Sequence, residues 1–160
     1  MDKTKILFVC LGNICRSPSA EAVMKAMIEK KGMSDYFEID SAGTLAYHKG
    51  EKADLRMRQH ASKRGYNLTS LSRPVNPEKD FKYFDMIIGM DDRNIRDLNQ
   101  LALDEKSRKK IYKMTDFAQN MTMSVVPDPY YGGDAGFELV LDILEDSCEG
   151  LINRLASNRD

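Results

Sequence analysis

The chain has 160 residues, with 24 Lys and Arg against 25 Asp and Glu, and a formal net charge of -1 at pH 7. Residues 1–160 are long enough to bury about 70% of their unfolded surface in one core, so we expect a single domain that needs no metal or disulfide for stability. The balanced charge excludes a nucleic-acid-binding or membrane-surface character at the level of the whole chain.

The first third of the chain predicts a strand, a helix and a second strand, joined by two short loops. Ser17 suits the N-cap of the helix, with Pro at its first position, and Gly32 ends its apolar periodicity. The loop Cys10–Ser17 follows the first strand, and a loop of small residues, 41–44, follows the second. In chain order the three elements are a strand over residues 6–9, a helix over residues 18–31 and a strand over residues 37–40.

The rest of the chain continues to alternate helices with strands. Pro74 and Pro77 are expected to break the chain, and residues 106–110 to form a solvated connector. Alternation of this kind favours a parallel sheet covered by helices on both faces, in which ligands bind beyond the carboxyl ends of the strands. The predicted elements are a helix over residues 54–64 ending at Gly65, a strand over 85–90, a helix capped by Asp91, a strand over 110–113 and a helix over 137–155.

The loop Cys10–Ser17 gives the clearest chemical signal in the sequence. A loop that closes on an arginine and opens a helix can wrap its backbone N–H groups around a tetrahedral oxyanion, with the Cys10 sulfur beneath it. Gly12 permits close approach of the backbone, and Arg16 offers a bidentate fork to phosphate oxygens. Arg16, the Ser17 hydroxyl and the helix dipole all favour a thiolate at Cys10. The loop therefore predicts a nucleophile beneath a bound oxyanion.

The cysteine count and the N-terminus bear on compartment and cofactors. Three cysteines, two of them in one turn, fit a reducing compartment and a reactive thiol. The apolar run over residues 6–10 is too short for a signal peptide or a membrane span, so we expect a cytoplasmic protein that binds neither membranes nor nucleic acid. His48 and His60 lack metal-ligand or triad spacing and are expected to lie on the surface or pack. No metal and no other cofactor is expected.

At three places the sequence resembles the low molecular weight protein tyrosine phosphatase family. They are Cys10–Ser17, Ser41-Ala42-Gly43-Thr44 and Asp128-Pro129-Tyr130-Tyr131-Gly132, and the resemblance spans the whole chain. It implies an α/β fold with three layers, α/β/α, a four-stranded parallel sheet and the phosphate-binding loop after the first strand. It also implies hydrolysis of phosphotyrosine in proteins and of small aryl phosphates, with phosphate or other oxyanions as inhibitors. A monomer or weak dimer is expected.

The implied mechanism needs a nucleophile, an oxyanion site and a proton donor. Cys10 attacks phosphorus and forms a cysteinyl-phosphate, while Asp128, protonated by family resemblance, delivers a proton to the leaving group. Water then displaces the sulfur with Asp128 as base. Because Cys10 must be ionised while Asp128 is protonated, the first step should be fastest on the acidic side of neutral. The expected phosphate-binding residues are Leu11, Gly12, Asn13, Ile14, Cys15, Arg16 and Ser17.

The resemblance also implies supporting residues. Asn13 and Ser41 should brace the loop, and Ser17 should donate a hydrogen bond to the thiolate. Many members have a His three residues before the arginine equivalent to Arg73, whereas this chain has Ser70, which puts the hydrogen-bond brace behind Asn13 in question.

The substrate cleft is expected to be lined by Leu11, Ile14, Tyr47, Tyr130 and Tyr131. Tyr47 stands where many relatives have Trp. Related protein-arginine phosphatases tend to have Thr at the place of Ile14, so this residue favours phosphotyrosine. In members with a second loop cysteine, here Cys15, that residue can form a reversible disulfide with Cys10.

Two other functions remain open on the same loop. A thiol-linked arsenate reductase would bind its oxyanion similarly, but it needs a relay of cysteines, and Cys15 is the only neighbour of Cys10 in sequence. A non-catalytic phosphotyrosine-binding module would not need Cys10, Arg16 and Asp128 together. The phosphatase remains the favoured interpretation.

Overall fold

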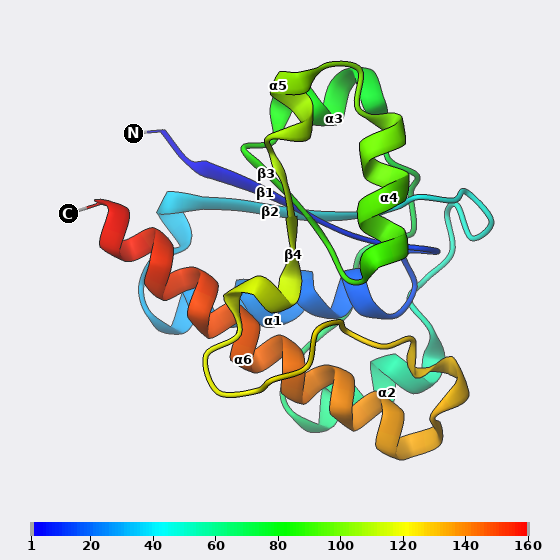
Figure 1. Ribbon diagram of the computed structural model, residues 1–160. Helices are drawn as coiled ribbons and strands as arrows, with labels where there is room; N and C mark the ends of the chain where they lie inside the picture. The colour runs from blue at the N-terminus through cyan, green and yellow to red at the C-terminus, as the bar shows by residue number, and fades with distance from the viewer. Residues whose placement is uncertain (1, 160) are drawn as a thin grey trace.

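A computed structural model describes residues 2–159, apart from the side chains of Tyr131 and Arg159, and places four parallel strands between two layers of helices (Figure 1). The strands are β1 (Thr4–Cys10), β2 (Phe37–Gly43), β3 (Met86–Gly89) and β4 (Ile111–Lys113), in the order β2-β1-β3-β4. The helices are α1 (Arg16–Lys30), α2 (Leu55–Lys63), α3 (Pro77–Tyr83), α4 (Asp92–Leu101), α5 (Glu105–Arg108) and α6 (Gly133–Arg159), with short 3-10 turns η1 (Ser34–Tyr36), η2 (Met114–Phe117) and η3 (Pro129–Tyr131). The predicted fold class is confirmed.

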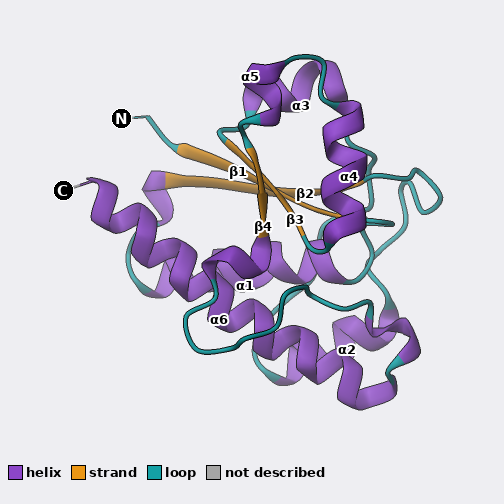
Figure 2. Cartoon of the chain, in the orientation of Figure 1, coloured by secondary structure: helices purple, strands orange, loops and turns teal. Residues whose placement is uncertain are grey.

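The central strand β1 is buried on both faces, which explains its continuous apolar sequence. Ile6 and Phe8 join one apolar cluster with residues of α1 and α6, while Leu7 and Val9 join another with residues of α3 and α4. Figure 2 shows the corresponding layers, with α3, α4 and α5 on one side of the sheet and α1 and α6 on the other. Among residues 2–159, no helix combines the length and apolar character needed to cross a membrane.

Two helices form where none was predicted. Pro77 does not break the chain but occupies the first turn of α3, where a missing N–H is tolerated, and the Asn76 side chain caps it by accepting from the Lys79 amide at 3.2 Å. The expected connector near residue 106 instead contains α5, capped by Asp104. The first error comes from reading a proline as a break where it starts a helix, and the second from reading a run of charged residues as a connector without the cap that precedes it.

Three predicted boundaries were also wrong. Helix α1 begins at Arg16 with Cys15 at its N-cap, because the Ser17 hydroxyl is directed to the Cys10 sulfur instead of to the helix amides. The loop expected at residues 41–44 is strand through Gly43. Helix α6 starts one turn earlier than residue 137, at Gly133.

The carboxyl ends of β1 and β2 position the Cys10–Ser17 loop. Cys10 lies opposite Gly43 in the strand register, and the chain leaving β2 continues to follow the loop. The Thr44 amide donates to the Cys10 carbonyl and the Leu45 amide to the Leu11 carbonyl, both at 3.0 Å. The end of β2 therefore supports the loop from one side.

Candidate active site

The Cys10 sulfur is enclosed by the start of α1. Cys10 is the last residue of β1 and only 3% exposed. Its Sγ lies 3.1 Å from the Ser17 hydroxyl oxygen and 3.4 Å from the Ser17 amide nitrogen. Because a helix N-terminus and two hydrogen-bond donors face the sulfur, the site favours a negative charge there.

Asn13 shapes the turn of the loop. Its φ of 57° lies in the left-handed region, which Asn tolerates better than most residues. Its Nδ2 donates to the hydroxyls of Ser17 at 2.7 Å and Ser41 at 3.0 Å, and its Oδ1 accepts from the Arg73 amide at 3.0 Å. Among the described contacts, Ser70 contributes nothing to Asn13. The brace that the Ser70 departure put in question is formed by these three partners.

A buried acid that the sequence did not single out completes this support. The Ser41 hydroxyl accepts from Asn13 and donates to Glu21 Oε1 at 2.6 Å. Glu21 is 6% exposed and pairs with Lys25 at 2.6 Å. The hydrogen bonds therefore run from the Asn13 amide through the Ser41 hydroxyl to the Glu21 carboxylate, which Lys25 holds in place. A buried glutamate on α1 could be suspected only once the helix face toward the sheet is known.

Ser72 contacts the loop from another segment. Its hydroxyl donates to the Gly12 carbonyl at 2.9 Å, and the residue is 4% exposed. Sequence reasoning directed attention to Ser70 instead, because the family pattern is counted from Arg73. Ser72 therefore holds the loop at the Gly12 carbonyl, as the segment after β2 holds it at the carbonyls of Cys10 and Leu11.

Arg16 is held in place by two partners of its own. It is 4% exposed, and its NH1 donates to Asp91 Oδ2 at 2.6 Å and to the Val126 carbonyl at 3.0 Å. Burial would lower the pKa of the guanidinium, but the Cys10 sulfur and the Asp91 carboxylate outweigh that effect and raise it. Asp91, predicted only as a helix cap, both caps α4 and pairs with Arg16.

Most of the predicted site residues line one cleft of about 300 Å³ beside Cys10. Asn13, Ser17 and Ser41 do not line it, because their side chains are buried and hydrogen-bonded to one another. Asp128 is exposed at its edge, and its Oδ1 accepts from the Tyr130 amide at 3.0 Å. Tyr47 is 83% and Tyr130 is 70% exposed, so these rings form the outer rim of the cleft. The Tyr131 side chain lies outside the described part of the structure, and its place in the cleft stays a prediction. The lining residues are Cys10, Leu11, Gly12, Ile14, Cys15, Arg16, Tyr47, His48, Asp128 and Tyr130.

His48 is a cleft residue that the sequence analysis set aside. It lines the cleft, and its Nδ1 lies 2.7 Å from Glu51 Oε2. A Cβ atom placed on Gly12 would lie 3.0 Å from His48 Cδ2, so the glycine is what allows the imidazole to approach the loop. Neither metal-ligand nor triad spacing could have indicated this position.

The two other cysteines have different surroundings. Cys15 is 8% exposed and lines the cleft with Cys10. Burial, followed by the charges of Asp54 and Cys10, raises the pKa of the Cys15 thiol, so it is held neutral. Cys148 is fully buried on α6 against the Ala20 carbonyl of α1.

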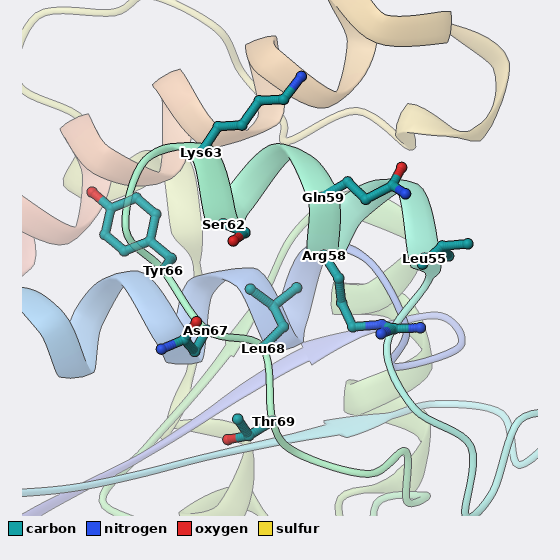
Figure 3. A pocket seen from close by; sticks show the side chains of 9 residues that line it. All are labelled: Leu55, Arg58, Gln59, Ser62, Lys63, Tyr66, Asn67, Leu68 and Thr69. Carbon is teal, nitrogen blue, oxygen red and sulfur yellow. The ribbon is translucent and has the colours of Figure 1, made fainter.

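A larger hollow lies elsewhere, along α2 (Figure 3). It is an open groove, and none of the predicted site residues lines it. Its side chains are polar or basic apart from Leu55 and Leu68, with no paired acid and nucleophile. The larger groove is therefore not the candidate active site, although large pockets are the usual first candidates.

Comparison with known proteins finds relatives along almost the whole chain. Residues 5–160 match the family of low molecular weight phosphotyrosine protein phosphatases. A low molecular weight phosphotyrosine protein phosphatase of Schizosaccharomyces pombe is 43% identical over 134 residues, covering 83% of this chain and 85% of the relative. The crystal structure of a protein tyrosine phosphatase from Entamoeba histolytica, with Hepes in its active site, superposes with a TM-score of 0.94 at 50% identity, covering 99% of this chain and 100% of the other. A Drosophila arginine phosphatase superposes with a TM-score of 0.87 at 31% identity, covering 94% and 97%.

Proposed function

The chain belongs to the low molecular weight phosphotyrosine protein phosphatase family and is an enzyme of that type, and from this premise we propose that it hydrolyses phosphotyrosine through a phosphate ester of Cys10. The observation that supports this mechanism is the meeting of Cys10, Arg16 and Asp128 in one cleft. A nucleophile, a cation for the oxyanion and a proton donor are the three groups that the reaction requires.

In the first step the Cys10 thiolate attacks phosphorus in line with the departing oxygen. The amides of residues 11–17 and the Arg16 guanidinium hold the phosphoryl oxygens, as the enclosed loop and the buried arginine support. Asp128 gives its proton to the tyrosine oxygen as the P–O bond breaks, which avoids release of a phenolate. The S–P bond forms as the O–P bond is lost.

In the second step water attacks the phosphocysteine. Asp128, now ionised, takes a proton from the water, and the sulfur leaves as a thiolate. The Ser17 hydroxyl, 3.1 Å from Sγ, stabilises that leaving group. Asn13 already donates to the Ser17 oxygen, so the hydroxyl proton is available for the sulfur.

The shape of the cleft supports phosphotyrosine in proteins as the substrate. Ile14 provides a branched apolar wall beside the loop, and the exposed rings of Tyr47 and Tyr130 can flank an aromatic ring at the rim. The Drosophila arginine phosphatase has the same fold, so the fold alone does not select the substrate. Ile14 is the feature of this chain that favours tyrosine over arginine.

The position of Cys148 disfavours the arsenate-reductase alternative. Reduction of arsenate at Cys10 would require further thiols to pass electrons on. Among the described residues, Cys15 is the one other cysteine of the cleft, and Cys148 is sealed between α1 and α6. We therefore assign Cys15 a protective role: it condenses with oxidised Cys10 to form a reversible disulfide.

The decisive experiment compares wild type with Cys10→Ser and Asp128→Ala on p-nitrophenyl phosphate and on phosphotyrosine, phosphoserine and phosphoarginine peptides. We expect phosphotyrosine to be preferred, Cys10→Ser to be inactive and Asp128→Ala to lose about 10²–10⁴-fold on the phosphotyrosine peptide. Cys148→Ala serves as a control for loss of a cysteine outside the cleft. Full activity of Cys10→Ser would refute the mechanism, and a preference for phosphoarginine would refute the substrate assignment.

A further inference from the structure

Helix α2 contacts the catalytic loop at its N-terminal end. The Asp54 amide, directly before α2, donates to the Ile14 carbonyl at 2.8 Å. The Asp54 side chain also caps the helix by accepting from the Met57 amide at 3.0 Å. One end of α2 is therefore fixed to the loop that contains the nucleophile.

The turn that contains Asp128 rests on the first turn of α6. The Gly136 amide donates to the Gly132 carbonyl at 3.1 Å. A Cβ atom on Gly132 would lie 2.9 Å from Gly136 Cα, and one on Gly136 would lie 3.3 Å from the Pro129 carbonyl oxygen. Because no side chain separates the two backbones, a displacement of the first turn of α6 also displaces Asp128.

His60 joins the two helices between these ends. Its side chain is 12% exposed, and its ring stacks on Phe137 of α6 with centroids 5.2 Å apart. Its Nδ1 contacts Glu138 Oε2, and its Nε2 lies 3.1 Å from Asp134 Oδ1. A neutral imidazole has one N–H, whereas both of these nitrogens face carboxylate oxygens, so the arrangement requires the imidazolium.

Other charges surround the same contact. From α2, Arg56 pairs with Asp134 at 2.9 Å and Arg64 pairs with Glu138 at 2.7 Å. Lys63 lines a small pocket together with His60, Asp134 and Glu138. Arg56 and then His60 lower the pKa of Asp134, and Arg64 and then His60 lower the pKa of Glu138, so both carboxyls are ionised. Figure 3 shows Arg58 and Ser62 projecting from the other side of α2. One side of α2 is thus joined to the start of α6 by a group of ion pairs.

We propose that His60, as an imidazolium bridging Asp134 and Glu138, is a positioning residue for Asp128. The proposal rests on the proposed role of Asp128 as proton donor. With both bridges made, the first turn of α6 is held against α2 and Asp128 is fixed relative to the loop that α2 also contacts. Loss of the His60 proton removes one bridge, so proton donation to the leaving group weakens as His60 becomes neutral.

The test exploits the dependence of proton donation on the leaving group. Tyrosine is a poor leaving group that needs Asp128, whereas p-nitrophenolate leaves readily without a proton. For His60→Gln we expect kcat/KM to fall about tenfold on a phosphotyrosine peptide, since small misplacements of a catalytic group are costly, and to change less than about twofold on p-nitrophenyl phosphate. Asp134→Ala, which removes the exposed partner, should act in the same direction.

A pH series and a control variant separate positioning from general destabilisation. The ratio of wild-type to His60→Gln activity on the peptide should approach one as rising pH neutralises His60. Lys31→Gln breaks an ion pair of 2.9 Å with Glu149, in the C-terminal half of α6, and should leave both activities unchanged. A pH-independent ratio would indicate a merely structural effect and overturn the proposal.

The double variant with Asp128→Asn distinguishes failure of this inference from failure of the proposed function. If Asp128→Asn alone lowers kcat/KM, which reports formation of the phosphocysteine, equally on both substrates, Asp128 is not the proton donor and the proposed function fails. If Asp128→Asn is selective but His60→Gln is not, only the positioning role fails. The positioning role also fails if the His60→Gln loss persists undiminished in the Asp128→Asn background, because it then does not act through Asp128.

Discussion

Arg16 NH1 lies 2.6 Å from Asp91 Oδ2, and this ion pair joins the Cys10–Ser17 loop to the start of α4. The Val126 carbonyl accepts from the same nitrogen at 3.0 Å. The guanidinium is therefore oriented before any oxyanion arrives, which is the condition for strong electrostatic stabilisation of a transition state. The positive charge of the buried Arg16 is therefore neutralised by the single carboxylate of Asp91 that pairs with it.

Replacing Asp91 with Asn should lower stability and increase the stabilising effect of phosphate. Removing one partner of a buried pair is costly, and we expect about 2 kcal/mol here because the Asp91 side chain is partly exposed. Phosphate would then supply the missing negative charge, so thermal melts should show a larger phosphate-induced rise in Tm for the variant than for wild type. Asp97→Asn on the same helix, whose contact with Arg93 is 4.0 Å long and exposed, is the control. Equal phosphate shifts would contradict the charge argument.

Gly43→Ala should disable the enzyme from the end of β2. The new Cβ would lie 3.0 Å from the Leu11 carbonyl, 3.1 Å from the Leu45 carbonyl and 3.2 Å from Asn13 Cβ. Backbone atoms cannot rotate away, so the loop must shift, and we expect a loss of about 100-fold in kcat/KM and about 1–3 kcal/mol in the free energy of unfolding.

Gly12→Ala provides the contrast to this variant. Its Cβ would meet the tip of the half-exposed His48 ring, which can move, so stability should be close to that of wild type. Chemical denaturation should measure the free energy of unfolding of both variants, and steady-state assays should measure kcat/KM of Gly43→Ala. Wild-type activity of Gly43→Ala would show that the loop tolerates displacement at this point.

The reactive loop could be predicted because its chemistry is contiguous in sequence. Cys10, Arg16 and Ser17 lie within one turn, and the strand before them and the helix after them have clear apolar patterns. Asp128 is 118 positions away, and only family resemblance indicated it. The segment that follows β4 brings it to the same cleft, where the Val126 amide donates to the Met90 carbonyl and the Val126 carbonyl accepts from Arg16.

Apart from Asn13, Ser17 and Ser41, which the family resemblance indicated, the residues that support the loop could not be predicted. Asp91, Glu21 and Ser72 act through contacts between segments distant in sequence, and each looks like an ordinary cap or surface residue when viewed locally. Helix α3 was missed because Pro77 was interpreted as a break although Asn76 before it is a helix cap. The local sequence allows each of these residues several structural roles, and contacts with distant segments determine which role it takes.

Cys15→Ser should convert reversible oxidation of the enzyme into irreversible loss. Peroxide oxidises the Cys10 thiolate to a sulfenic acid. The Cys15 sulfur then attacks it, giving up its proton to the departing hydroxyl, so that an S–S bond forms and water is released. Wild type should regain activity with a thiol reductant and show a Cys10–Cys15 crosslink by mass mapping. In Cys15→Ser the sulfenic acid has no partner in the cleft and proceeds to the sulfinic acid. Full recovery of the variant, with Cys148→Ala as control, would eliminate the protective role.

Asp146 anchors the segment that leads to the acid turn, and its contribution should depend on pH. Its carboxylate accepts from the amides of Gln119 at 3.0 Å, Asn120 at 3.1 Å and Met121 at 3.0 Å. Burial would raise the pKa of Asp146, but these amides outweigh it and lower the pKa below its ordinary value.

Because the folded-state pKa is lowered, the stabilisation is complete above the unfolded value of about 3.9 and is lost as pH falls through the folded value. Asp146→Asn should therefore be less stable than wild type by about 1 kcal/mol at pH 7, since hydrogen bonds to a charged acceptor are the stronger ones. Urea denaturation should give the same difference at pH 7 and pH 5.5, and a smaller one below pH 4, where wild type also loses its charge. A difference that grows on acidification would reverse the sign and show that the amides do not stabilise the carboxylate.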